Sequence, residues 1–170
     1  EHLHELRNET APRLFQCYVA DSASIVGLFE RVDQYLGAPD VVVYNPSARA
    51  KGPLIDLNPV DVERVIAIAA FGGFLVAQQA ARCMLSKGQG AILFTGASGS
   101  VEGYAQAAPF AMGKFALRGL AQSIARELAP QGIHVAHFVI DGAIRQNDDA
   151  HQGDGYDSML DPDAIAQTYL

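Results

Sequence analysis

The histidines and acidic residues of this sequence do not gather at the spacing that a metal site requires. His134 and His137 lie three residues apart in a run typical of a strand, so their side chains point to opposite faces and cannot share one ion. His2 and His4 resemble a cluster by composition alone, and the acidic residues of 145–158 lack the ligand spacing of a calcium loop. We expect no metal site, and we interpret His134 and His137 as core or edge residues.

The residues best suited to proton transfer stand around one glycine-rich loop. Ser98 belongs to the loop GASGS, Tyr104 follows it, and Lys114 comes ten residues after the tyrosine. A hydroxyl group can protonate or hydrogen-bond a reacting carbonyl oxygen, and a lysine can lower the pKa of a neighbouring acid. Each residue also has a structural reading: Ser98 as a turn hydroxyl, Tyr104 as a rim aromatic, and Lys114 as a helix lysine that extends to solvent.

These residues belong to a predicted strand–helix–strand unit. Residues 91–95 (AILFT) and 133–140 (IHVAHFVI) are apolar runs of strand length. Between them, apolar side chains recur at helical spacing, at Leu117, Leu120, Ala121, Ile124 and Leu128. Pro130 and Gly132 then end the helix. Two apolar strands joined by a helix are typical of a parallel sheet covered on both faces.

The rest of the sequence continues the alternation of strands and helices. The expected elements are strands over 14–19 and 41–44, helices over 25–36 and 59–86, and a short last helix that begins at 161–163. Asp21-Ser22 and Asn58-Pro59 are the predicted helix starts, and Gly37 the predicted end of the first of these helices. Gly72-Gly73 favours the close approach of another helix, with a local kink as the alternative.

This alternation predicts an α/β fold with an open, doubly wound parallel sheet. In such sheets, ligands bind outside the carboxyl ends of the strands. The residues at those ends are Asp21, Asn45, residues 95–99, and Asp141-Gly142. We therefore expect any ligand site to be built from these positions.

The composition narrows the range of partners. The 170 residues carry 12 basic and 19 acidic side chains, a net charge of −7, without a basic run. We therefore expect neither nucleic acid nor a membrane surface as a partner, but a small-molecule substrate. Apolar stretches end well before the length that spans a membrane. Cys17 and Cys83 are interpreted as reduced thiols of a cytosolic protein, with a disulfide as the alternative.

The segment that follows the strand at 91–95 resembles the catalytic segment of the short-chain dehydrogenase/reductase family. In that family a serine precedes, by about a dozen residues, a Tyr-x-x-x-Lys motif on a helix that leads into a strand. Lys114 stands at the lysine position of the motif, and Phe110 stands where the tyrosine is expected. Thirteen residues before Phe110 is Ala97, at the position of the serine, and Ala69 occupies the position of the family's asparagine.

The resemblance implies a Rossmann-type fold and NAD or NADP as cofactor. It gives Lys114 the role of holding the cofactor ribose, Asp21 a contact with the adenine, and Asn45 a place in the cofactor cleft. Asp141-Gly142 replaces the family's Pro-Gly beside the nicotinamide, and so completes the cofactor-binding set. The choice between NAD and NADP is not specified by these residues.

The same resemblance predicts impaired or altered acid catalysis. Phe110 cannot give a proton to a carbonyl oxygen, and a lost general acid typically costs about 10²- to 10⁴-fold in rate. We expect an NAD(P)-dependent oxidoreductase for an alcohol or carbonyl, in which Lys114 orients the ribose and Phe110 shapes an apolar pocket. Water or a displaced side chain, with Ser98 and Tyr104 as the candidates, would supply the proton. The alternative is a catalytically silent member that binds nucleotide or protein partners.

The resemblance covers roughly the middle two-thirds of the family's domain. The first strand with its TGxxxGxG turn and the last strand have no counterpart in the sequence. We expect residues 1–170 to form one such domain, incomplete at both ends and unable to fold alone, in which 145–158 is a mobile substrate loop. The family's usual contacts further imply a homodimer or homotetramer formed through the helices at 59–86 and 108–129.

Overall fold

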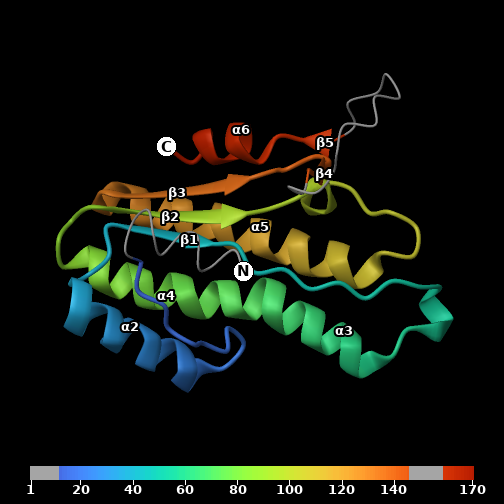
Figure 1. Cartoon of the computed structure of the whole chain (residues 1–170), viewed down its shortest axis with the longest axis horizontal. Coiled ribbons are helices and arrows are strands. Elements are labelled where there is room, and N and C mark those ends of the chain that lie inside the picture. The colour runs from blue at the N-terminus through green and yellow to red at the C-terminus, as the bar shows by residue number, and fades with distance from the viewer. Residues whose placement is uncertain (1–11, 146–158) are drawn as a thin grey trace.

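The computed structural model describes residues 12–145 and 159–170, and Figure 1 shows their arrangement. Helices and strands alternate along most of this part of the chain. The helices are α2 (Ser22–Leu36), α3 (Pro59–Ile66), α4 (Gly72–Leu85), α5 (Ala108–Leu128) and α6 (Pro162–Gln167), with a π-helical turn η2 (Ala67–Phe71) and short 3₁₀ turns η1 (Leu54–Asp56), η3 (Ser98–Ser100) and η4 (Ala129–Gln131). The strands are β1 (Val41–Tyr44), β2 (Gly90–Thr95), β3 (Ile133–Phe138), β4 (Ala143–Ile144) and β5 (Met159–Leu160).

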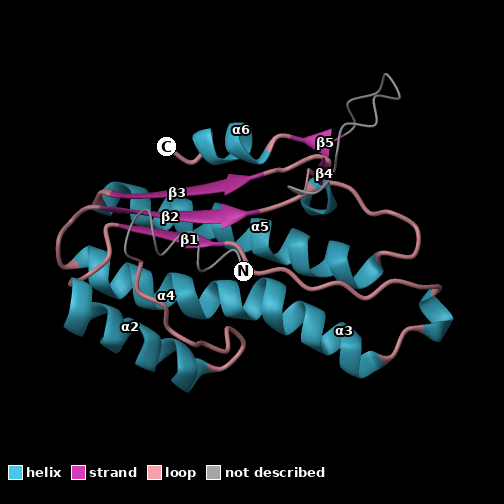
Figure 2. Cartoon of the chain, in the orientation of Figure 1, coloured by secondary structure: helices cyan, strands magenta, loops and turns pink. Residues whose placement is uncertain are grey.

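The main sheet is parallel, with the strand order β1-β2-β3 (Figure 2). In its register Tyr44 is opposite Phe94, and Thr95 is opposite Phe138, so the carboxyl ends of the three strands lie side by side. β4 and β5 form a second, two-stranded parallel pair. The predicted strand–helix–strand unit and its parallel pairing are confirmed.

One layer of helices covers one face of the main sheet. α4 and α5 pack on the face to which Ile92 and Phe94 of β2 point, and α2 packs against α4 in the same layer (Figure 1). Thr95 and Phe138 point to the opposite face, where Tyr169, just after α6, stacks on the Phe138 ring at a centroid distance of 4.0 Å. The Tyr169 hydroxyl also lies 2.7 Å from Thr95 Oγ1. Helical segments therefore contact both faces, as expected for this α/β class.

The helix boundaries follow the capping residues of the sequence. The Asp21 carboxylate accepts the backbone N–H of Ser24 at the start of α2, and α2 ends at Gly37. Asn58 accepts the backbone N–H of Val60, and Pro59 is the first residue of α3. These predicted boundaries are confirmed.

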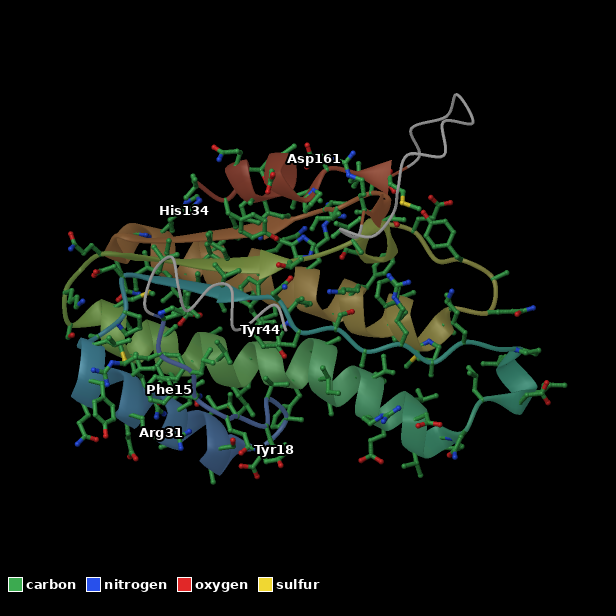
Figure 3. All side chains as sticks on the ribbon, in the orientation of Figure 1. Phe15, Tyr18, Arg31, Tyr44, His134 and Asp161 are labelled. Carbon is green, nitrogen blue, oxygen red and sulfur yellow. The ribbon has the colours of Figure 1, made fainter. Side chains whose placement is uncertain are left out.

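The prediction of a strand over residues 14–19 is wrong. These residues form no backbone ladder with any described strand, and a strand without a partner leaves its N–H and C=O groups unpaired. The segment is held by side chains instead: Cys17 packs against the core, and the Arg31 Cζ atom of α2 lies 5.7 Å from the Phe15 ring centroid (Figure 3). The predicted strand at 41–44 is confirmed; among the described strands it lies at the edge of the sheet, and Val41 is 57% exposed.

The predicted helix over 59–86 contains a π-helical turn between α3 and α4. The backbone N–H of Gly72 donates to the carbonyl of Ala67, five residues back. The hydroxyl of Tyr44, which lies between β1 and the helical layer in Figure 3, donates to the carbonyl of Ile68. π turns of this kind frequently occur at functional sites, and here the turn faces α5.

Gly72 and Gly73 both allow close approach. A Cβ atom at Gly73 would lie 2.5 Å from Leu117 Cδ1 of α5, which confirms the predicted helix contact. A Cβ atom at Gly72 would lie 2.7 Å from the backbone oxygen of Val19. The pair is therefore explained by packing at this crossing as well as by the local change in helix geometry.

Several predictions fall on residues 1–11 and 146–158. They include the opening helix with His2 and His4 and most of the predicted substrate loop, and they lie outside the described residues. Cys17 and Cys83 are free thiols. In the part of the chain that the structure describes, no helix combines the length and the apolar character needed to cross a membrane.

Candidate functional site

A cavity of about 490 Å³ lies at the carboxyl end of the main sheet. Its wall combines the loop after β1, the loop between β2 and α5, the start of α5 and the segment after β3. The lining residues are Arg49, Lys51, Ser98, Tyr104, Ala105, Gln106, Ala107, Phe110, Asp141, Gly142 and Ala143. This volume is in the range of pockets that hold metabolite-sized ligands.

The loop after β2 is held in place by the segment after β3. The backbone N–H of Gly96 donates to the carbonyl of Phe138 at 2.7 Å, and that of Ser98 donates to the carbonyl of Ile140 at 3.1 Å. These two bonds continue the pairing of β2 with β3 beyond the end of the ladder. They fix Ser98 at the edge of the cavity.

The Phe110 ring fills the space that Gly99 leaves open. A Cβ atom at Gly99 would lie 2.6 Å from Phe110 Cε1, so a larger residue there would push the ring away. Phe110 thus forms an apolar wall of the cavity, half-buried, at the first turn of α5. Its ring carries no atom that can donate a proton.

Lys114 lies one helical turn beyond Phe110 and is 3% exposed. Its Nζ atom donates to the backbone carbonyl of Thr95 at 2.8 Å and lies 6.0 Å from the Phe110 ring centroid. Burial, and then the charge of Arg49, lowers the pKa of Lys114 from 10.5 to about 8. An ammonium group has three donors, and Thr95 is its one hydrogen-bond acceptor among the described residues.

The lowered pKa of Lys114 predicts a pH dependence of stability. Between about pH 8 and 10.5 the unfolded chain binds more protons at this lysine than the folded chain, so stability rises with pH. We expect wild type to gain on the order of 1–3 kcal/mol over Lys114→Met across this window, and nothing below it. Denaturant unfolding of the full-length proteins at several pH values measures this difference. A difference that does not change with pH would contradict the burial of a charged lysine.

The structure gathers part of the predicted site around the cavity. Ser98, Phe110 and Asp141-Gly142 line it together, and Tyr104 joins them. Lys114 is not among the lining residues, although it lies close to Phe110.

Asp21 and Asn45 do not line the cavity. The Asp21 carboxylate caps α2, and Asn45 is exposed after the end of β1. Their predicted cofactor contacts stay predictions.

Two charged residues that line the cavity were not predicted from the sequence. Arg49 and Lys51 lie on the loop after β1, and the Arg49 Cζ atom lies 4.6 Å from the Phe110 ring centroid. The loop is tied to the opposite wall, because the Gly52 N–H donates to the carbonyl of Gln106 at 3.1 Å. Arg49 and Lys51 follow the end of a strand, and ligands of parallel sheets bind at such ends. This position is the signal that could have identified the two residues.

The side chains of the two histidines of β3 point in different directions, as their spacing predicts. His134 is exposed, whereas His137 is directed at Gly96, where its ring occupies the space of a Cβ atom. The Nε2 atom of His137 is buried without a hydrogen-bond partner among the described residues. Burial, and then the charges of Arg118 and Lys114, lowers its pKa, so the neutral ring is favoured. No group of three metal-ligating side chains occurs among residues 12–145 and 159–170.

A family model and several curated proteins of the same kind match this chain. The family model described as short chain dehydrogenase matches residues 1–147. The 3-oxoacyl-[acyl-carrier-protein] reductase MabA of Mycobacterium tuberculosis is 33% identical over 141 residues, which cover 81% of this chain and 57% of that protein. Human 17-beta-hydroxysteroid dehydrogenase type 1 is 34% identical over 71% of this chain and 36% of its own length. The chain spans about half the length of the first curated relatives it matches.

Solved structures share the fold. A short-chain dehydrogenase from Rhodopseudomonas palustris has a TM-score of 0.80 at 30% identity, over 99% of this chain and 73% of that one. A gluconate 5-dehydrogenase from Burkholderia cenocepacia, in complex with NADP and tartrate, has a TM-score of 0.72 at 27% identity, over 75% of this chain and 50% of that one. An NAD⁺-bound xylitol dehydrogenase has a TM-score of 0.75 at 26% identity, over 78% and 51%.

Proposed function

This chain belongs to the short-chain dehydrogenase/reductase family, and from that membership we propose that its protein is an NAD(P)-dependent oxidoreductase for an alcohol or carbonyl substrate. Similar structures contain NADP or NAD⁺, which supports a nicotinamide cofactor. The relatives have names that range from acyl-carrier-protein reductase to steroid dehydrogenase, so they do not specify the substrate.

The buried ammonium of Lys114 is the observation that carries this proposal. Burying a charge is costly unless polar partners satisfy it, and Thr95 alone accepts from this group among the described residues. The ribose hydroxyls of a dinucleotide are acceptors of the right kind for the remaining N–H donors. Lys114 therefore fits the ribose end of the cofactor. The cofactor, when bound, supplies the hydride.

In the proposed reaction the walls of the cavity orient the substrate. Phe110 presents an apolar surface, and Ser98 lines the same space. Tyr104 also lines the cavity, and its hydroxyl donates to Glu102 Oε2 at 3.4 Å. The proton that a reduced carbonyl needs would come from Ser98, Tyr104 or water, because Phe110 has none to give.

Cofactor binding that depends on Lys114 tests the proposal. We expect NADH or NADPH to bind the full-length protein in the micromolar range, and Lys114→Ala to weaken binding by about tenfold or more, as for a charge-assisted hydrogen bond. Titration followed by nicotinamide fluorescence measures both. Lys114→Met keeps the bulk of the side chain and should weaken binding equally, whereas Lys87→Ala removes a surface lysine as a control. No binding of either nucleotide by wild type would overturn the proposal.

A second candidate is a catalytically silent member of the family that binds nucleotide or partners. Three positions support it, since Ala69, Ala97 and Phe110 all lack the polar atoms that the family mechanism uses. Nucleotide binding without hydride transfer to any carbonyl would favour this candidate.

We also propose that the protein forms a homodimer or homotetramer through α3, α4 and α5. Large apolar side chains are exposed on these helices at Val60, Phe74, Met112 and Phe115, and on the π-helical turn η2 at Phe71. Exposed apolar side chains that form one contiguous patch usually mark a contact surface. Sedimentation of the full-length protein as a monomer would overturn this part of the proposal.

A further inference from the structure

The cavity concentrates positive charge in an acidic protein. The chain has a net charge of −7, yet two of the lining side chains, Arg49 and Lys51, are cationic. Asp141 is the one acidic residue among those that line the cavity. The ammonium of Lys114 adds a further positive charge near Arg49. A concave, positively charged wall attracts anionic ligands.

Three other cations of the described structure are paired with carboxylates. Arg64 contacts Asp61 at 3.2 Å, Lys87 contacts Asp40, and Arg145 contacts Asp161. Within the described ranges, Arg49 and Lys51 have neither a salt bridge nor a side-chain hydrogen bond. The interaction that Arg49 does make is with the Phe110 ring, and it leaves the N–H donors of the guanidinium free for an anion.

The backbone holds this cationic wall in place. Gly52 follows Lys51 directly and has a φ of 149°, a conformation that favours glycine. Its N–H donates to Gln106, whose own φ of 60° is unusual for a residue with a side chain. Uncommon backbone conformations at both ends of one hydrogen bond are typical of functional loops. The bond connects the loop that carries Arg49 and Lys51 to the opposite wall of the cavity.

We propose that the substrate of this site carries a carboxylate, bound by Arg49 and Lys51, close to the carbonyl or hydroxyl that reacts. This inference rests on the proposed function. A guanidinium matches a carboxylate through two parallel hydrogen bonds, which fixes the orientation of the ligand. Phe110 stands at the position of the family's proton donor, and Arg49 lies over its ring. The carboxylate and the reacting carbon of the substrate would therefore be only a few atoms apart.

The substrate class is therefore a small oxo acid or hydroxy acid. In the reductive direction, the carbonyl carbon takes a hydride from the reduced nicotinamide cofactor. The carbonyl oxygen takes a proton from Ser98, Tyr104 or water. The hydroxy acid and the oxidised cofactor are the products.

A panel of straight-chain oxo acids, each with its methyl ester, tests this inference on the full-length protein. We expect the acid to exceed its ester by about tenfold or more in kcat/KM, and rising salt to reduce that preference. Arg49→Gln should remove most of the preference, and Arg49→Lys should restore part of it, since it keeps the charge but not the paired hydrogen bonds. Arg82→Gln, an exposed arginine of α4, controls for the change in net charge.

The outcomes separate the two proposals. Equal use of acids and esters, or an acid preference that survives Arg49→Gln, would overturn the carboxylate assignment and leave the oxidoreductase intact. Turnover of neutral ketones alone would do the same. If no nucleotide binds, the proposed function fails, and calorimetry with the oxo acids then decides the inference by itself. Acid binding that Arg49→Gln abolishes would support the carboxylate site, and no acid binding would overturn it.

Discussion

Replacing Phe110 by tyrosine is expected to raise the rate of carbonyl reduction by about 10²- to 10⁴-fold. The change restores a phenol at the position where the family resemblance expects the proton donor. Lys114, with its Nζ atom 6.0 Å from the ring centroid, would favour the ionised phenol and lower its pKa toward the working range. Gly99 leaves room for the ring, because it places no side chain against it. The measurement is oxidation of NADH or NADPH with a carbonyl panel.

The control for this prediction is Phe115→Tyr. Phe115 lies on the same helix, is 46% exposed, and is not among the residues that line the cavity. The Phe115→Tyr substitution adds the same hydroxyl group without placing that group near a substrate. If Phe110→Tyr binds cofactor but reduces carbonyls no faster than Phe115→Tyr, the placement of the reaction beside Phe110 is wrong. Adding Ala97→Ser to Phe110→Tyr should increase the rate further, since the family resemblance assigns to position 97 the serine that hydrogen-bonds the same oxygen.

Gly72→Ala is expected to destabilise the protein by about 2 kcal/mol or more, although alanine is the better helix former. The added Cβ atom would lie 2.5 Å from the Tyr44 hydroxyl oxygen and 2.7 Å from the backbone oxygen of Val19. A backbone carbonyl cannot move aside as a flexible side chain can. The hydrogen bond from Tyr44 to Ile68 beside the π turn would be strained by the same intrusion.

Gly27→Ala is the matched control, because it places the same methyl group inside α2. A Cβ atom at Gly27 meets nothing within 4 Å, so the helix propensity of alanine should stabilise the protein by roughly 0.5–1 kcal/mol. Denaturant unfolding of the full-length variants gives both values. Equal stabilities for the two variants would mean that Gly72 does not lie in a tight crossing.

Local sequence patterns predicted most of the elements correctly. The apolar runs of β2 and β3, the caps Asp21 and Asn58, and the helix end before Gly132 all depend on neighbouring residues. The strand predicted over 14–19 failed for a non-local reason. An apolar run becomes a strand only if another strand pairs with it, and its own residues do not show whether such a partner is present.

The sequence predicted the site residues that stand at motif positions. It missed the site residues that an irregular loop carries into the cavity. Ser98, Phe110 and Asp141 follow strand ends or stand on the helix after one, so the topology brings them together. Arg49 and Lys51 reach the cavity because an irregular loop is tied to the opposite wall by one backbone hydrogen bond. A contact of that kind depends on the path of both loops. Such a contact leaves no periodic pattern in the sequence, so the sequence alone does not predict it.

Transfer of deuterium from labelled nicotinamide tests the central claim most directly. NADH and NADPH that carry deuterium at the reactive carbon of the nicotinamide ring would be incubated with the full-length protein and a panel of oxo acids and ketones. Mass spectrometry of the alcohols then reports the label. The account predicts one deuterium per product molecule, formed slowly by wild type and faster by Phe110→Tyr. Nucleotide binding by both proteins without any label in any product would contradict it, and would leave a family member that binds nucleotide but performs no reduction.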